Sequence, residues 1–167
     1  MADELDLLEL LQADHLNLRE SEGHAELEEV VAKHLTVERE LFYPLIVRRS
    51  ICSHEELEEL RTIDRSLANA VLQAKADPSS EEALKQAVDT HISVQEALFS
   101  IVRDQVDPAT LLRIAEDLPL TVAEAPTHVH PHLLDHGPLI GAAEDIAEAV
   151  DTFEDRFRRS DRPGDRP

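Results

Sequence analysis

The chain has 167 residues, with 36 acidic against 16 basic side chains, and a formal net charge of −20 at pH 7. This length suits one domain with a substantial core and is too short for two. So strong a negative charge argues against nucleic acid or an anionic membrane as a partner, because both attract Lys and Arg. Cys52 is the only cysteine, so no internal disulfide can form, which suits a cytoplasmic protein. No apolar run approaches the ~18 residues that a membrane helix requires.

Four long segments have the spacing of apolar residues that is typical of amphipathic helices. The first two cover about residues 5–20 and 25–47, and Pro44 is expected to disturb the last turn of the second. The third opens at Ser53, where Glu56 completes a capping box. The fourth follows residues 77–80 and ends near residue 106. Because the joining loops are short, we predict an all-α fold, an antiparallel up-down-up-down four-helix bundle.

The chain changes character after the fourth segment. A short fifth helix is predicted over about residues 109–117. Residues 118–141 should lie extended over the bundle because they are interrupted by Pro119, Pro126, Pro131 and Pro138. A last amphipathic helix is predicted over about residues 142–158. Its Phe153/Phe157 stripe should pack on the bundle or on a second copy of the chain. A homo-oligomer is therefore possible. The chain thus divides into a bundle, residues 1–118, and a C-terminal extension with a frayed tail, residues 119–167.

A block of twenty residues occurs twice in the chain. Residues 27–46 match residues 84–103 without a gap, and each copy carries one histidine on its apolar face. These histidines are His34 and His91. Helices repeated in this way should hold the two imidazoles at the same level, on two sides of a metal site inside a bundle.

A carboxylate accompanies the first of these histidines. Glu38 lies four residues after His34, so the two side chains point to the same helix face about one turn apart. A buried carboxylate and imidazole are costly unless they are paired or bind a metal. The second copy has Gln95 at the matching position, followed by Glu96, and the sequence leaves open which of the two faces inward.

The first and third helices align in the same way, which places His15 level with Asp64. Each of the four helices then offers an inward group that can bind a metal: His15, His34 with Glu38, Asp64, and His91 with Gln95 or Glu96. Mixed imidazole and carboxylate ligands suit iron, manganese or zinc better than magnesium or calcium.

Three motifs carry a resemblance to a known family: Asp14-His15, residues 34–44 and residues 91–99. The second fits a His-x-x-x-Glu pattern followed by an apolar-aromatic-Pro ending. Residues 125–132 are also similar to a Pro/His tail found after the bundle in actinobacterial members of that family. Together these motifs resemble the hemerythrin-like HHE cation-binding domain over most of the chain.

The resemblance implies an antiparallel four-helix bundle that holds an oxo- or hydroxo-bridged pair of non-haem irons. His15 and His34 would be terminal ligands and Glu38 a bridging carboxylate. His91 would bind the second iron, and Glu96 fits the fourth-helix carboxylate of oxygen-carrying hemerythrins.

Two positions depart from the family pattern. Members place a histidine in the third helix where this chain has Asp64, and they favour Glu where this chain has Gln95. The half of the site that includes Glu38 therefore keeps the ligands of the family pattern. The other half has fewer ligands and is called the thinned half below.

The leading hypothesis is a cytoplasmic hemerythrin-like protein that binds non-haem iron and meets dioxygen, peroxide or nitric oxide. A single iron, zinc or manganese ion fits the thinned site equally well, held by His15, His34, Glu38 and His91. The alternative from another class is a metal-free family member that acts as an interaction or regulatory module. No acid–base pair separate from the predicted ligands is apparent, so the sequence leaves enzymatic activity undecided.

Four further histidines follow the bundle: His128, His130, His132 and His136. Tracts of this kind do bind metals. Because alternate residues of an extended segment point to different sides, a packing role is the expected one.

Overall fold

The computed structural model describes residues 5–21 and 23–131, and all regular secondary structure in these ranges is helical, as predicted. The elements in chain order are α1 (Leu7–Glu20), α2 (His24–Val37), η1 (Glu38–Phe42), α3 (Tyr43–Arg48), α4 (His54–Ala76), η2 (Pro78–Ser80), α5 (Glu81–Gln105), α6 (Pro108–Ala115) and α7 (Leu118–Glu124). The predicted helix over residues 142–158, its Phe153/Phe157 stripe, His132, His136 and the tail lie outside the described residues. The division at residue 118 stays a prediction.

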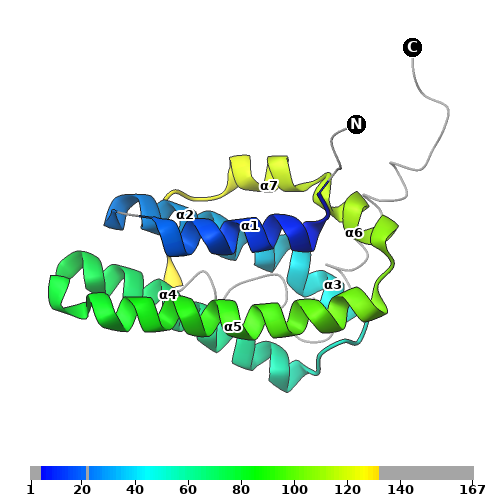
Figure 1. The fold of residues 1–167 in the computed structure, drawn as a ribbon, viewed down its shortest axis with the longest axis horizontal. Helices are drawn as coiled ribbons and strands as arrows, with labels where there is room; N and C mark the ends of the chain where they lie inside the picture. The colour runs from blue at the N-terminus through cyan, green and yellow to red at the C-terminus, as the bar shows by residue number, and fades with distance from the viewer. Residues whose placement is uncertain (1–4, 22, 132–167) are drawn as a thin grey trace, which may run out of the picture.

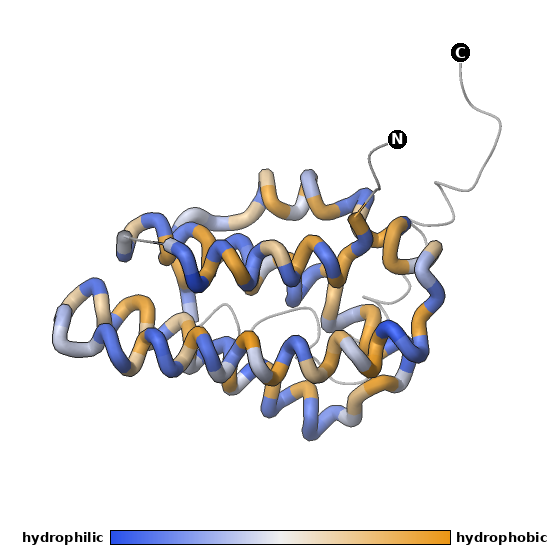
Figure 2. Tube along the Cα trace, in the orientation of Figure 1, coloured by the Kyte–Doolittle hydropathy of each residue, from blue (hydrophilic) through white to orange (hydrophobic). Residues whose placement is uncertain are grey.

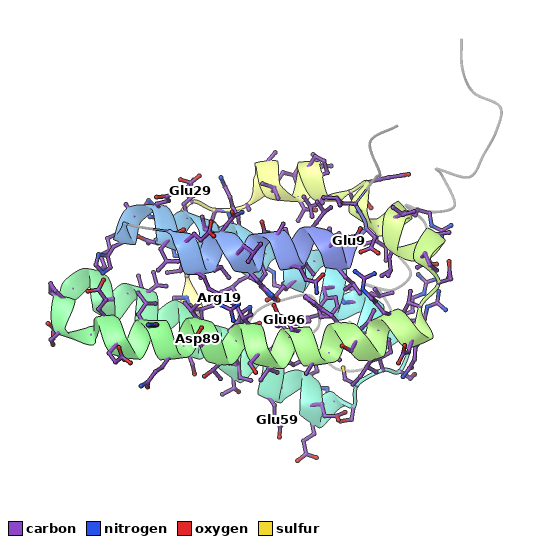
Figure 3. The ribbon with its side chains drawn as sticks, in the orientation of Figure 1. Glu9, Arg19, Glu29, Glu59, Asp89 and Glu96 are labelled. Carbon is purple, nitrogen blue, oxygen red and sulfur yellow. The ribbon has the colours of Figure 1, made fainter. Side chains whose placement is uncertain are left out.

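Helices α1, α2, α4 and α5 surround a shared interior. α1 lies against α2 and α5, and α4 lies against the same two helices (Figure 1). Asp6, at the start of α1, pairs with Arg103 near the end of α5 at 2.9 Å. Arg19, in the last turn of α1, lies 3.6 Å from Asp89 of α5, and Figure 3 shows the two facing each other. Within the described residues, no helix combines the length and apolar content needed to cross a membrane.

The interior consists of two apolar clusters with polar side chains between them. Hydrophobic residues recur along each of the four helices (Figure 2). In α1, Leu11 belongs to the first cluster and Leu18 to the second, and buried His15 falls between them. Asp64 in α4 and His91 in α5 likewise fall between residues of the two clusters. The fold therefore places a buried polar layer at one level of an otherwise apolar core.

The predicted start of α4 is confirmed. Ser53 Oγ accepts from the Glu56 N–H, and the Glu56 carboxylate accepts from the Ser53 N–H. A second capping box, formed by Asp6 and Glu9, starts α1 and was not predicted. Both boxes satisfy N–H groups that have no partner inside the helix.

The second predicted helix forms with a wider turn inside it. α2 runs directly into the π-helical η1 and then α3, and the Tyr43 N–H donates to the carbonyl oxygen of Glu38. Pro44 follows at once and has no N–H to donate, so the wider turn accommodates it. In a regular α-helix, residues five apart point about 140° away from each other. Here the Glu38 and Tyr43 side chains are both buried, so the π-turn brings two polar groups into the interior.

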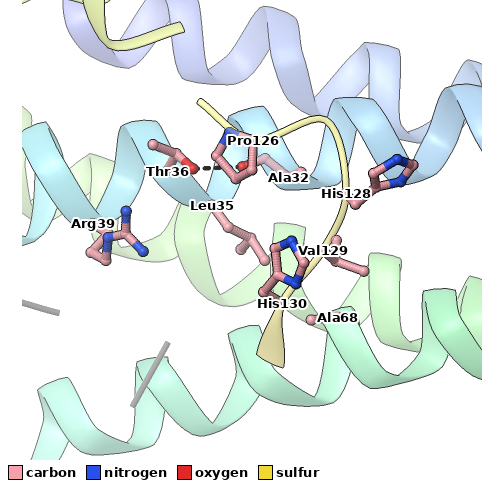
Figure 4. Close-up of a pocket in the computed structure, with 9 residues that line it drawn as sticks. All are labelled: Ala32, Leu35, Thr36, Arg39, Ala68, Pro126, His128, Val129 and His130. Atoms are coloured by element: carbon pink, nitrogen blue, oxygen red, sulfur yellow. Dashed lines mark hydrogen bonds between the residues drawn. The ribbon is translucent and has the colours of Figure 1, made fainter. Parts of the chain in front are cut away.

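The expectation that residues 118–141 contain no regular helix is wrong at their start. α7 covers Leu118–Glu124, with Pro119 in the first turn, where its missing N–H would have had no helical partner. The following residues do lie against the bundle. Val129 is buried in the second apolar cluster, over α2 and α4 (Figure 4). Nδ1 of His128 lies 3.1 Å from the buried Glu28 carboxylate, although the His128 side chain is itself exposed, so the packing role of the histidine tract stays a prediction.

Candidate metal centre

Four buried side chains converge in the polar layer. His15 comes from the middle of α1, His34 from the last turn of α2, Glu38 from the first position of η1 and His91 from the middle of α5. Each is at most 1% exposed. One ligand atom from each lies within 4.8 Å of the others, and among the described residues this is the group that can hold a metal ion.

The distances between the donor atoms of His34, Glu38 and His91 fit a single ion. Nε2 of His34 lies 3.0 Å from Nε2 of His91 and 3.2 Å from Oε1 of Glu38, while Nε2 of His91 lies 3.5 Å from the same oxygen. Two ligands at about 2.1 Å from one ion are about 3.0–3.4 Å apart for bond angles between 90° and 109°. His15 offers a ring nitrogen within 4.8 Å of the other donor atoms, and its ring centroid lies 5.0 Å from that of His34.

The centre contains polar atoms that the protein alone leaves without hydrogen bonds. Both ring nitrogens of His15 and both carboxylate oxygens of Glu38 are buried and lack a hydrogen-bond partner. Leaving a buried polar group unpaired costs about 1–3 kcal/mol, and more for a charged group. A cation at the centre would engage one nitrogen of His15 and the Glu38 carboxylate together. The donor chemistry therefore fits a transition-metal ion.

A carboxylate stands behind each of the three imidazoles. Asp64 lies 3.2 Å from Nδ1 of His91, and Glu96 lies 3.6 Å from Nδ1 of His15. The third is Asp14, at 3.7 Å from Nδ1 of His34. Metal-bound histidines commonly direct their second ring nitrogen to such a carboxylate.

The predicted ligands Asp64 and Glu96 are thus not among the converging donors. Asp64 approaches the edge of His91 opposite to the nitrogen that faces Glu38. The Glu96 side chain is 45% exposed, whereas Gln95 is 1% exposed and faces the interior. Asp14 was not predicted as a site residue. Its position directly before the inward-facing His15 was a signal for it in the sequence. The carboxylate, however, contacts His34 of α2.

A second buried network adjoins the centre. The Tyr43 hydroxyl donates to Oδ2 of Asp64 at 2.5 Å, and the Gln95 amide donates to the Tyr43 oxygen at 3.2 Å. Burial and the neighbouring carboxylates raise the pKa of Tyr43 well above its usual value, so the phenol keeps its proton and acts as a donor. Tyr43 was not predicted as a site residue, and it reaches this position through the π-turn.

Charge is distributed unevenly over the four donors. Burial, together with repulsion from His34, lowers the pKa of His15 to about 3. Burial opposes a charge on His91 as well, but the surrounding carboxylates, above all Glu38, outweigh it and raise the pKa of His91 to about 10. The pKa of His34 is raised for the same reason. Burial would raise the pKa of Glu38, yet the two imidazoles hold it well below its usual range.

The close approach of His34 and His91 limits their protonation. Two Nε2 atoms 3.0 Å apart cannot both carry a proton on the line between them. One proton can bridge the two nitrogens as a hydrogen bond. A metal ion can take the place of that proton, because both nitrogens then serve as lone-pair donors.

We expect metal affinity to rise with pH. Because the pKa of His91 is raised to about 10, the metal-free centre retains a proton at neutral pH, and a metal must displace it. Each displaced proton should change the apparent affinity by about tenfold per pH unit. His15 is already neutral and should not contribute. Zinc titrations between about pH 6 and about pH 9 would measure the slope, and a flat profile would contradict this assignment.

Comparison with known proteins provides no identity for the chain. No protein-family model matches it, and neither a curated protein nor a solved structure matches it. The geometry of the centre and the sequence motifs are therefore the features from which a function can be inferred.

Proposed function

We propose that this chain is a hemerythrin-like protein that binds one non-haem iron ion between its helices and meets a small oxidant there. The observation that carries the proposal is the convergence of three imidazoles and one carboxylate, all buried, within 4.8 Å. Iron bound by such ligands supplies Lewis-acid and one-electron chemistry toward dioxygen, peroxide or nitric oxide. With Cys52 as the only cysteine, the cytoplasm is the compartment that suits this protein.

The proposal includes the up-down-up-down arrangement of the bundle. Asp6, at the start of α1, pairs with Arg103 near the end of α5, whereas Arg19, in the last turn of α1, pairs with Asp89 in the first half of α5. Between α2 and α4, Glu28 pairs with Lys75 at 2.7 Å, and farther along, Tyr43 contacts Asp64. Residues later in α2–α3 thus contact residues earlier in α4. Both patterns support antiparallel neighbours.

One ion, rather than a bridged pair, suits the donors. A second ion would require another group of ligands some 3.5–4 Å beyond the first, at about the separation of two-metal sites. The side chains on that side are Tyr43, Asp64 and Gln95, which hydrogen-bond in a row. Gln95 supplies only a neutral amide. The thinned half of the site is therefore filled by a protein network.

The protein's own groups would bind the ion, orient its ligands and exclude water. Three of the four donors come from histidines whose second nitrogen lies 3.2–3.7 Å from a carboxylate, which would favour a proton on that nitrogen and leave the first nitrogen free to bind the ion. Leu18, Leu41 and Leu67 are buried and belong to the apolar clusters around the polar layer. Such a surrounding limits access to small, weakly polar molecules.

Metal analysis tests the proposal directly. Protein purified without chelator should contain about one equivalent of iron, and less than about half an equivalent of any transition metal would overturn the proposal. Removing the metal should also destabilise the fold, because only the folded state binds it. At free metal about 100 times Kd, the expected difference is about 2.7 kcal/mol, or about 5–11 °C in Tm for a chain of this size. A His34→Ala variant should show no such difference.

A second candidate is a metal-free interaction or regulatory module. It is favoured by the 3.0 Å contact between the His34 and His91 nitrogens, which can share a proton without a metal. In that case the melting temperature would not respond to added iron, zinc or manganese. The same experiment therefore separates the two candidates.

A further inference from the structure

Tyr43 is buried in a row of polar side chains that leads from Gln95 to the metal centre. It is 2% exposed, and its hydroxyl donates to Oδ2 of Asp64 at 2.5 Å. The other oxygen of that carboxylate, Oδ1, lies 3.2 Å from Nδ1 of His91. The row crosses three elements, since Tyr43 begins α3, Asp64 lies in α4 and His91 lies in α5.

The two oxygens of Asp64 have different roles in this row. One accepts the Tyr43 proton, and the other faces the His91 nitrogen that points away from the donor set. A carboxylate at Nδ1 favours the tautomer with a proton on Nδ1, which leaves Nε2 as the nitrogen with a free lone pair. Nε2 is the His91 atom that faces His34 and Glu38.

We propose that Tyr43 and Asp64 are positioning residues of the metal centre: the phenol holds the Asp64 carboxylate against His91, and the carboxylate directs Nε2 of His91 toward the ion. This inference rests on the proposed function, since it concerns the same site. Neither residue is a ligand. Without the Tyr43 hydroxyl, Oδ2 of Asp64 has lost its donor and the carboxylate is free to turn away from the imidazole.

Metal affinity tests the proposal through two isosteric substitutions. Tyr43→Phe and Asp64→Asn should each weaken zinc binding by about 10- to 100-fold, the usual effect of removing a partner of a metal-bound histidine. The matched control is Thr36→Val. It also removes a buried hydroxyl of the same continuous helix, but that hydroxyl donates only to the Ala32 carbonyl oxygen, so affinity should stay unchanged. Far-ultraviolet circular dichroism without metal checks that each variant is folded. If Asp64→Asn does not fold, the zinc affinity of Tyr43→Phe alone decides the test.

The composition of the chain supplies a second readout. The chain has one tyrosine and no tryptophan, so its phenol absorption and emission report on Tyr43 alone. Zinc is colourless and has no redox chemistry, so it can be added without absorbing or oxidising the reporter. Zinc should shift the phenol spectrum of the wild type, and the shift should disappear in Asp64→Asn at saturating zinc, because the carboxylate transmits it. A merely structural tyrosine would not respond.

The outcomes are distinct from those that test the proposed function. A wild-type protein that binds no metal overturns the proposed function and this inference together. A wild type that binds zinc, with both variants within about twofold of it, overturns only the inference. A tyrosinate charge-transfer band in the iron-loaded protein would also overturn it, since Tyr43 would then be a ligand itself.

Discussion

Replacing Glu38 by Gln should weaken metal binding by roughly 100- to 4,000-fold. Glu38 is the only anionic donor among the four, and it is fully buried between His34 and His91. Removing one partner of a buried charged pair costs about 3–5 kcal/mol, and each 1.4 kcal/mol corresponds to a factor of ten in affinity. The amide keeps the shape of the side chain, so the loss should come from charge and not from packing.

The structure offers a matched control for this substitution. Glu40 lies in the same π-turn, two residues after Glu38, but its side chain is 40% exposed and pairs with Arg39. Glu40→Gln should leave the affinity unchanged. Competition with a chelator of known affinity would measure both variants. Equal affinities for Glu38→Gln and wild type would contradict the assignment of Glu38 as a ligand.

Replacing Phe99 by Ala should lower the free energy of unfolding by about 3–5 kcal/mol, as large aromatic-to-alanine changes in cores do. Phe99 is 1% exposed, stacks on the His15 ring at 5.5 Å and meets the Phe42 ring edge-to-face at 5.2 Å. For a chain of this length the melting temperature should fall by about 6–20 °C. Because the ring also supports His15, metal affinity should decrease as well.

The control for Phe99 lies two residues further along α5. Ile101 is also a large apolar residue, but it is 45% exposed. Ile101→Ala should change the free energy of unfolding by no more than about 0.5 kcal/mol, as surface substitutions usually do. Urea unfolding of the metal-free proteins would give both values. A small effect at Phe99 would mean that the first apolar cluster tolerates a cavity beside the centre.

Much of the candidate site follows from local periodicity. The repeat of residues 27–46 at 84–103 predicts that His34 and His91 occupy matching faces, and both are buried side by side. The spacing of four residues between His34 and Glu38 likewise predicts their contact, because a helix brings such residues one above the other. These relations depend only on positions within one helix, or on two helices with the same pattern.

Other features depend on how the helices face each other. Asp64 is level with the histidines, as the alignment predicts, but it approaches His91 from behind because α4 presents it to Nδ1. The side that Gln95 and Glu96 face was undecided, since neighbouring positions differ by about 100° around the helix and either can be turned inward. The packing of α5 buries Gln95.

The amino-acid sequence by itself determined the helical class, the start of α4 and a set of six candidate ligands that contains the four converging groups, because helix periodicity and capping are local properties. The tertiary structure alone decided the π-turn that buries Tyr43, the helix at Leu118–Glu124, and the carboxylate behind each imidazole. Those features depend on one extra residue in a turn and on contacts between side chains far apart in the chain. The periodicity of apolar residues predicts neither the extra residue nor these contacts.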